Sequence, residues 1–230
     1  PIVRRHSSVS VQGGRPLKSP GRLMIPGDLS SAAFFLTAAA CLAGSHLEIV
    51  DVSLNPTRAH AITVLQRMGA RITCRLAQER WEPQGSVQVE GGPLQAAMVT
   101  PEEVPAVIDE LPVLMVAACG AKGTSVLRGI GELRMKETDR IQSMVEGLTR
   151  LGASVTLASG DELRIAGSRL TGAGVDSRQD HRTAMALAVA GLMAEGTTRI
   201  AGAECVAKSY PDFFEVLGRL AGPGAVEIIR

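Results

Sequence analysis

The sequence predicts an α+β fold in which one unit, reading β-α-β-α-β-β, is written three times. An acidic residue, an apolar helix, a glycine and a short strand recur in that order three times, and a second helix follows each time. Hydrophobic residues make up 45% and charged residues 20% of the 230 residues, which is typical of a globular protein. Because the first helix of each unit has few polar residues, we expect these helices inside, around a pseudo-threefold axis, with the sheets outside.

The elements follow in the same order in each unit. The expected first helices span 32–42, 113–119 and 184–193, and the strands after them 46–50, 124–127 and 197–200. The expected second helices span 59–68, 139–151 and 212–220. Strands 71–76 and 86–89 close the first unit, strands 154–157 and 162–165 the second, and a strand over Ala225–Ile229 the third. The turn Ser159-Gly160-Asp161 is typical of a hairpin between the strands of the second unit.

Two of the second helices end in nearly the same sequence, which supports the repeat. Leu-Gln-Arg-Met-Gly-Ala ends the first at Ala70, and Leu-Thr-Arg-Leu-Gly-Ala ends the second at Ala153. Gly69 and Gly152 suit the left-handed residue that commonly follows a helix. A repeat of this kind predicts a fold and says little about function by itself.

Residues 1–21 lie outside the repeats. Val9 and Val11 alternate with polar residues as in a strand, and Gly13-Gly14 and Ser19-Pro20-Gly21 are typical of a linker. We therefore place a boundary near Gly21 and expect a domain over 22–230, with repeats at about 22–100, 101–170 and 171–230. The chain opens at Pro1 without an initiator methionine, so we expect it to be a piece of a longer protein.

Composition and charge restrict the partners. A net charge of +1 provides no basic excess to neutralise many phosphates, and aromatic residues make up 3%, so nucleic acid is not an expected partner. Apolar runs such as 32–44 are too short to cross a bilayer, so we expect no membrane partner. The four cysteines and four histidines have neither disulfide nor metal-ligand spacing. We expect buried thiols, no metal and a cytoplasmic location.

The run Lys136-Glu137-Thr138-Asp139-Arg140 is the first candidate for chemistry. If a helix begins there, Lys136 and Arg140 are four residues apart and share a face, with Glu137 beside them. Amide groups at a helix start favour anions, so the run suits a site that holds phosphate or carboxylate while a carboxyl moves a proton. The alternative interpretation is a solvated turn of mixed charge.

Other charged residues stand at equivalent points of the units. Acids precede all three first helices, where they can simply cap free amides. Arg182 lies in the first turn of an apolar helix and needs an anionic partner, which a structural salt bridge would also provide. Lys208 precedes the last helix, just as the 136–140 run and Arg58 precede the other second helices. Taken alone, Lys208 is typical of a surface lysine. If the units surround an axis, Asp109 and these junctions converge at one end.

Four motifs together resemble a known family. Pro26-Gly27-Asp28-Leu29-Ser30-Ser31-Ala32, Leu133-Arg134-Met135-Lys136-Glu137-Thr138-Asp139-Arg140, Asp180-His181-Arg182 and Ala207-Lys208-Ser209-Tyr210-Pro211-Asp212-Phe213-Phe214 are similar to those of 5-enolpyruvylshikimate-3-phosphate (EPSP) synthase. Their order and spacing match as well, over essentially the whole chain. The set does not fit the related UDP-N-acetylglucosamine enolpyruvyl transferases.

The resemblance implies a fold, a reaction and a set of roles. Family members have two domains of three such units and transfer the enolpyruvyl group of phosphoenolpyruvate to the 5-hydroxyl of shikimate 3-phosphate, releasing phosphate without metal or organic cofactor. By motif match, Asp109 handles the hydroxyl proton and Glu137 protonates the methylene carbon and later removes that proton. The remaining matches imply substrate binding: Arg140, Arg182 and Lys208 for phosphoenolpyruvate, Lys136 with Asp109 for shikimate 3-phosphate, and His181.

The resemblance also implies what this chain lacks. Many family members carry Asn where this chain has Glu132. The N-terminal half of the enzyme, whose first segment completes this domain, is absent, so we expect the chain alone to turn over little or not at all. Two other hypotheses remain: a sister transferase acting on a nucleotide sugar, and a non-catalytic anion-binding or scaffolding domain.

Overall fold

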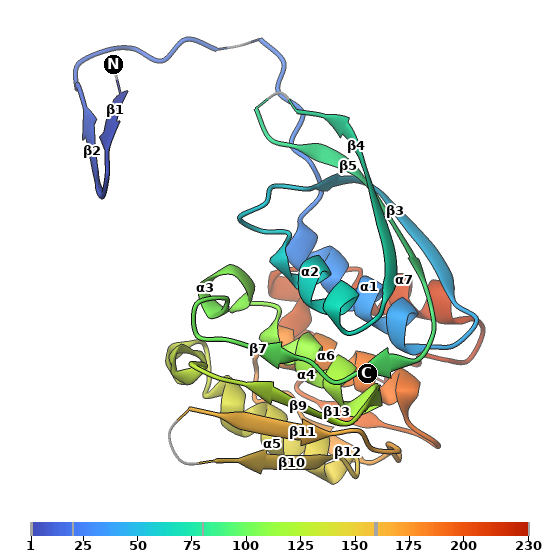
Figure 1. Cartoon of the computed structure of the whole chain (residues 1–230). Helices are drawn as coiled ribbons and strands as arrows, with labels where there is room; N and C mark the ends of the chain where they lie inside the picture. Colours follow the sequence, from blue (N-terminus) through green and yellow to red (C-terminus); the bar gives the residue numbers. More distant parts are fainter. Residues whose placement is uncertain (1, 20, 80, 159–160, 230) are drawn as a thin grey trace.

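Three buried helices occupy the centre of the computed structural model, which describes residues 2–19, 21–79, 81–158 and 161–229 (Figure 1). They are α1 (Leu29–Cys41), α4 (Leu111–Gly120) and α6 (His181–Met193), and each contacts the other two. Alanine and larger apolar residues lie on every face of the three helices; α1 is buried from Ala32 to Ala40 and α6 from Thr183 to Ala190. The prediction that the three first helices pack together inside is confirmed.

The first unit builds an antiparallel sheet outside α1. Its strands β3 (His46–Ser53), β4 (Arg71–Gln78) and β5 (Gln84–Glu90) lie in the order β3-β5-β4, and α2 (His60–Arg67) follows β3. Gly27, just before α1, forms a parallel bridge to Val52 of β3. The strand β3 is longer than predicted because it continues past an irregularity at Asp51, whose φ is 55°.

The second unit repeats this arrangement. Its sheet has the order β7-β9-β11-β10, with β7 parallel to β9 and the other neighbours antiparallel. The bridge at Gly27 in the first unit therefore corresponds to β7 here. The bounds are β7 (Met98–Val99), α3 (Val104–Val107), β9 (Thr124–Leu127), η1 (Gly131–Met135), α5 (Arg140–Arg150), β10 (Ser154–Leu157) and β11 (Leu163–Ala166). The predicted turn at 159–161 lies mostly outside the described residues.

The third unit has a shorter sheet. Strand β12 (Gly174–Asp176) pairs in parallel with β13 (Arg199–Ala201), and η2 (Ala203–Lys208) and α7 (Phe213–Ala221) follow. The predicted strand Ala225–Ile229 is wrong, because in the described part of the chain this segment pairs with no strand. Backbone groups of a strand need a neighbouring strand, and Ile228 and Ile229 instead stay exposed. A further parallel pair, β6 (Leu94–Gln95) with β8 (Ala121–Lys122), joins the first two units.

Aromatic packing closes the ring between the third and first units. The four phenylalanines and the one tyrosine of the chain gather between α1 and the segment around α7. Phe213 is fully buried, with ring centroids 5.9 Å from Phe34 and 5.3 Å from Phe35, and Tyr210 lies edge-on to Phe35. These pairs add directional contacts to the apolar burial that holds the three units together.

The N-terminal segment forms a hairpin that projects from the rest of the chain (Figure 1). Strands β1 (Ile2–Arg5) and β2 (Ser8–Val11) pair antiparallel, with Val9 opposite Arg4. The predicted strand at Val9 and Val11 is confirmed, whereas β1 was not predicted. Every described residue before Pro26 is exposed. Among the described residues, no helix has the length and apolar character to span a membrane.

Candidate active site

Side chains from the second and third units meet around the guanidinium of Arg140. Arg140 is the first residue of α5, and its side chain is only 1% exposed although it is large and charged. Its Nε donates to Asp180 Oδ2 at 2.8 Å, its Nη2 to Glu137 Oε2 at 2.5 Å, and its Nη1 lies 3.4 Å from Asp109 Oδ1. All three nitrogens of this buried cation thus face carboxylates, as a charge taken out of water requires.

Asp180 both pairs with Arg140 and caps the start of α6. It precedes α6, and its Oδ1 accepts hydrogen bonds from the backbone N–H groups of Arg182 and Thr183 at 2.8 and 3.0 Å. Its other oxygen receives Arg140, and the residue is fully buried. The expectation of a cap is therefore confirmed, but the cap also fixes the cation of the neighbouring unit. The equivalent placement of acids before all three first helices was the sequence signal for this link.

Asp109 and Arg182 connect the second unit to the third a second time. Arg182 Nη1 donates to the backbone carbonyl of Asp109 at 3.1 Å, and its Nη2 lies 3.5 Å from Asp109 Oδ2. The anionic partner that Arg182 needs is thus Asp109. The side chain of Asp109 is 27% exposed and lies between two guanidinium groups. We call Asp109, Glu137, Arg140, Asp180 and Arg182 the ionic cluster.

Glu137 and His181 lie at the exposed side of the ionic cluster. The Glu137 side chain is 51% exposed, so a ligand can reach its carboxylate while Arg140 holds it from beneath. Burial lowers the pKa of His181 below its ordinary value, although Asp180 and Glu137 act in the opposite direction. The neutral imidazole is therefore favoured near neutral pH, and it can donate or accept a hydrogen bond.

Within the described part of the chain, no hydrogen bond or ion pair joins Lys136 or Lys208 to the ionic cluster. The helix predicted over 139–151 is confirmed as α5, which begins at Arg140; Lys136 lies before it, after η1 and in extended conformation, so Lys136 and Arg140 do not share a helix face. The reason is that Asp139 caps α5 by accepting from Gln142 N at 3.0 Å. Lys136 Nζ instead lies 3.1 Å from Glu132 Oε1, and Lys208 is exposed at the end of η2.

The first unit contributes a smaller set of contacts that the sequence did not single out as a site. Arg58 Nη2 donates to Ser30 Oγ at 2.5 Å and lies 3.9 Å from Glu110 Oε1. Glu110 is 2% exposed, and its Oε1 accepts no hydrogen bond from the described residues. Burial raises the pKa of the Glu110 carboxyl, while Ser30, Arg182 and Arg58 counteract this and Asp109 adds to it. The starts of all three central helices therefore lie near one another.

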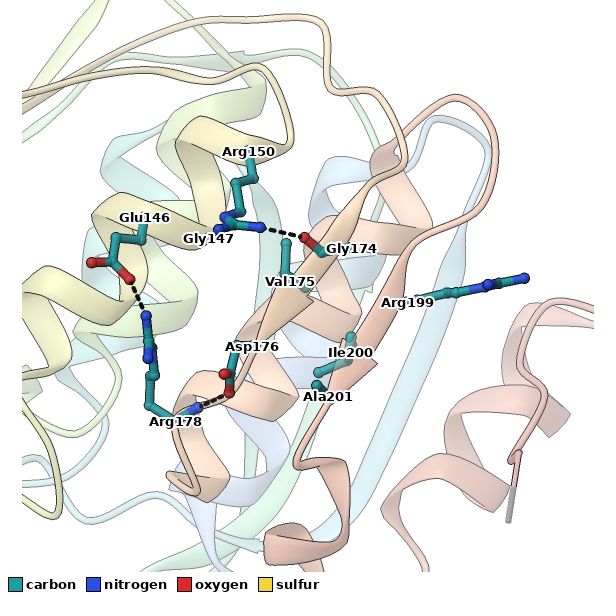
Figure 2. Close-up of a pocket in the computed structure, with 10 residues that line it drawn as sticks. All are labelled: Glu146, Gly147, Arg150, Gly174, Val175, Asp176, Arg178, Arg199, Ile200 and Ala201. Carbon is teal, nitrogen blue, oxygen red and sulfur yellow. Dashed lines mark hydrogen bonds and ion pairs between the residues drawn. The ribbon is translucent and has the colours of Figure 1, made fainter.

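A cavity of about 470 Å³ lies elsewhere in the described part of the chain. Its lining residues come from α5, β12 and β13 and their flanking turns (Figure 2). Some of its charged groups contact one another: Arg178 Nη2 lies 2.9 Å from Glu146 Oε2, and the backbone N–H of Arg178 donates to Asp176 Oδ1 at 2.8 Å, whereas Arg199 points away from both in Figure 2. It contains no residue of the ionic cluster. Within the described residues, no group of His, Cys, Asp and Glu is placed to hold a metal ion.

The comparisons with known proteins identify the family. Residues 2–217 match the family model described as EPSP synthase (3-phosphoshikimate 1-carboxyvinyltransferase). The chain belongs to the EPSP synthase family. Four members of the ionic cluster, all except Asp109, lie in the family-like motifs at 133–140 and 180–182, and the packing of Tyr210 and Phe213 accounts for part of the motif that follows Lys208.

Individual relatives agree with this assignment and show how much of the protein is present. The 3-phosphoshikimate 1-carboxyvinyltransferase of Carboxydothermus hydrogenoformans is 45% identical over 220 residues, which cover 95% of this chain and 51% of the relative. That of Synechococcus elongatus is 47% identical over 220 residues, covering 94% and 48%. The structure of EPSP synthase from Acinetobacter baumannii superposes with a TM-score of 0.83 at 33% identity, covering 95% and 51%. The chain spans about half the length of the curated relatives it matches.

Proposed function

We propose that this chain supplies about half of the active site of an enzyme that transfers the enolpyruvyl group of phosphoenolpyruvate to the 5-hydroxyl of shikimate 3-phosphate and releases phosphate. The observation that carries the proposal is the position of Arg140, which holds Glu137 and Asp109 on two sides of one buried cation. Membership of the EPSP synthase family supplies the reaction, and the ionic cluster supplies acid–base groups that a ligand can reach.

Asp109 and Glu137 are the proposed proton carriers. The transfer needs a base for the 5-hydroxyl proton and an acid for the methylene carbon of phosphoenolpyruvate, which must later give up a proton again. Asp109 takes the first role and Glu137 the second, and positioned acid–base groups of this kind contribute about 10²–10⁴-fold each. Because Arg140 fixes both carboxylates, it acts as a positioning residue here as well as a member of the anion clamp.

The cations are the proposed binding groups for two anionic substrates. Arg182 and Arg140 offer planar guanidinium groups that match carboxylate and phosphate oxygens, and His181 borders them. Lys208 and Lys136 stand at neighbouring helix junctions, and we propose that they reach the substrates when the site closes. Lys136 then exchanges its contact with Glu132 for shikimate 3-phosphate.

The other half of the protein is the proposed partner of this domain. The sheet of the first unit has three strands and a bridge at Gly27, and that of the second has four strands, whereas β12 and β13 pair with no third strand among the described residues. The chain also spans about half of its relatives. We propose that the N-terminal half closes over the ionic cluster and that its first segment completes the third sheet.

A phosphate-release assay tests the proposal. The chain is assayed with phosphoenolpyruvate and shikimate 3-phosphate, alone and mixed with the separately produced N-terminal half of the Carboxydothermus hydrogenoformans relative. We expect little or no turnover alone, turnover in the mixture, and none when a nucleotide sugar replaces shikimate 3-phosphate. Glu137→Gln and Asp109→Asn should abolish turnover of the mixture while the exposed control Arg128→Gln retains it. Turnover that survives both changes would contradict the assigned roles.

A further inference from the structure

In each of the first two units, an arginine near the start of the second helix pairs with an acid at the start of the next unit's first helix. In the second unit, Arg140 at the start of the second helix pairs with Asp180 at the start of the third unit's first helix. In the first unit, Arg58 just before α2 points to Glu110 at the start of α4. The two arginines therefore occupy corresponding places around the central helices and face corresponding acids.

The two links differ in how completely the arginine is used. Arg140 is 1% exposed, lies 2.8 Å from Asp180, and has a carboxylate at each of its three nitrogens. The Arg58 side chain is 44% exposed and lies 3.9 Å from Glu110. Among the described residues, its guanidinium donates one hydrogen bond, to the Ser30 hydroxyl. A guanidinium has five N–H donors, so most of those of Arg58 are available to a ligand.

Glu110 lies beneath Arg58 and beside the ionic cluster. Glu110 follows Asp109 directly in the sequence. The positive charges of Arg182 and Arg58 both act on its carboxylate. Its buried Oε1 accepts no hydrogen bond from the described residues, which is a costly state for a carboxyl group. The Glu110 carboxylate lies 3.9 Å from the guanidinium of Arg58 and so favours a position of this cation near the starts of α1 and α4.

We propose that Arg58 is a further anion-binding residue of the same site, contributed by the first unit and oriented by Ser30 and Glu110, and that it takes a phosphate or carboxylate oxygen of a substrate. This inference rests on the proposed function and deepens it. Anion binding would then come from all three units, whereas the roles implied by the resemblance place the binding residues only in the second and third units. Anchoring at Ser30 lowers the conformational entropy that Arg58 loses when it binds.

Titration of the ¹⁵N-labelled chain with inorganic phosphate, followed by NMR, tests the inference. Arg58→Gln should raise the dissociation constant for phosphate by about 5-fold, as expected for one half-exposed charged donor. Arg58→Lys, which keeps the charge without the planar group, should give a smaller increase. The control Arg128→Gln removes an arginine that is 48% exposed and paired with Glu162 on the sheet surface, and it should leave the dissociation constant unchanged.

A double-mutant cycle tests whether Ser30 acts through Arg58. Ser30→Ala should raise the dissociation constant about 2-fold in the wild-type background and should have no effect in the Arg58→Gln background. A purely structural role for Ser30 would give the same change in both. Thermal unfolding of each variant checks that the fold is retained.

The inference and the proposed function fail in different ways. If the wild-type chain binds phosphate and Arg182→Gln weakens binding while Arg58→Gln does not, the inference is wrong and the proposed function stands. If the wild-type chain gives no shifts at the amides of the ionic cluster at the highest phosphate concentration, the inference is overturned, whereas the proposed function is decided by the turnover of the mixture.

Discussion

Replacing Arg140 by Met should destabilise the domain strongly. The change removes the cation that pairs with the fully buried Asp180, and among the described residues that carboxylate then keeps the backbone N–H groups of Arg182 and Thr183. Removing one partner of a buried ion pair costs about 3–5 kcal/mol. Because two hydrogen bonds to Asp180 remain, we expect the lower end, about 3 kcal/mol. That is a large share of the roughly 5–15 kcal/mol that stabilises a typical domain.

Urea unfolding followed by circular dichroism measures this change. With a slope of about 3 kcal/mol per molar urea, a loss of about 3 kcal/mol moves the midpoint down by about 1 M. The double variant Arg140→Met/Asp180→Asn should recover a good part of the loss, because Asn keeps an oxygen for the cap and carries no charge. The control Arg128→Met removes an exposed pair with Glu162 and should cost less than about 1 kcal/mol. A midpoint for Arg140→Met equal to that of the control would refute the reasoning.

Two further predictions concern stability. The hydrogen bond from Arg67, above all, lowers the pKa of Glu103 to about 2, so its contribution is present above the unfolded value near 4.5 and is lost as pH falls toward 2. Arg67→Gln should therefore cost about 1 kcal/mol at neutral pH and flatten the dependence of unfolding free energy on pH between about 4.5 and 2; an unchanged slope would contradict this. A Cβ at Gly91 would lie 1.8 Å from the carbonyl oxygen of Leu42, so Gly91→Ala should destabilise by at least about 2 kcal/mol in thermal unfolding. The neighbouring Gly92→Ala meets only the flexible side chain of Arg71 and should be close to neutral; equal effects would argue against this packing.

The repeated helices could be predicted because the residues of each helix alone indicate that it is buried. The apolar residues of α1, α4 and α6 surround each helix, which is the pattern of a helix buried on all sides. The strand expected at Ala225–Ile229 was wrong for a non-local reason: alternation of apolar residues favours a strand only where a partner strand is present. The pairing of β1 with β2 depends on a turn at His6 with φ of 45°, which the sequence does not indicate.

The ionic cluster could be predicted in outline but not in its detail. The resemblance implied roles for Asp109, Glu137, Arg140 and Arg182, which the structure brings together. The sequence could not reveal that Arg140 is buried against Asp180, because this contact joins residues 40 positions apart in two units. The contacts of Arg58 with Ser30 and Glu110 likewise depend on how α1 packs against α4.

The proposed function requires that the starts of separate helices form one ligand site. Titration of the labelled chain with phosphoenolpyruvate and with shikimate 3-phosphate, followed by NMR at the backbone amides, tests this most directly. We predict that the amides of Asp109, Glu137 and Arg182 shift together with a single dissociation constant for each ligand. Shifts that occur only around the cavity lined by α5, β12 and β13, or that leave these three amides unaffected, would contradict this requirement.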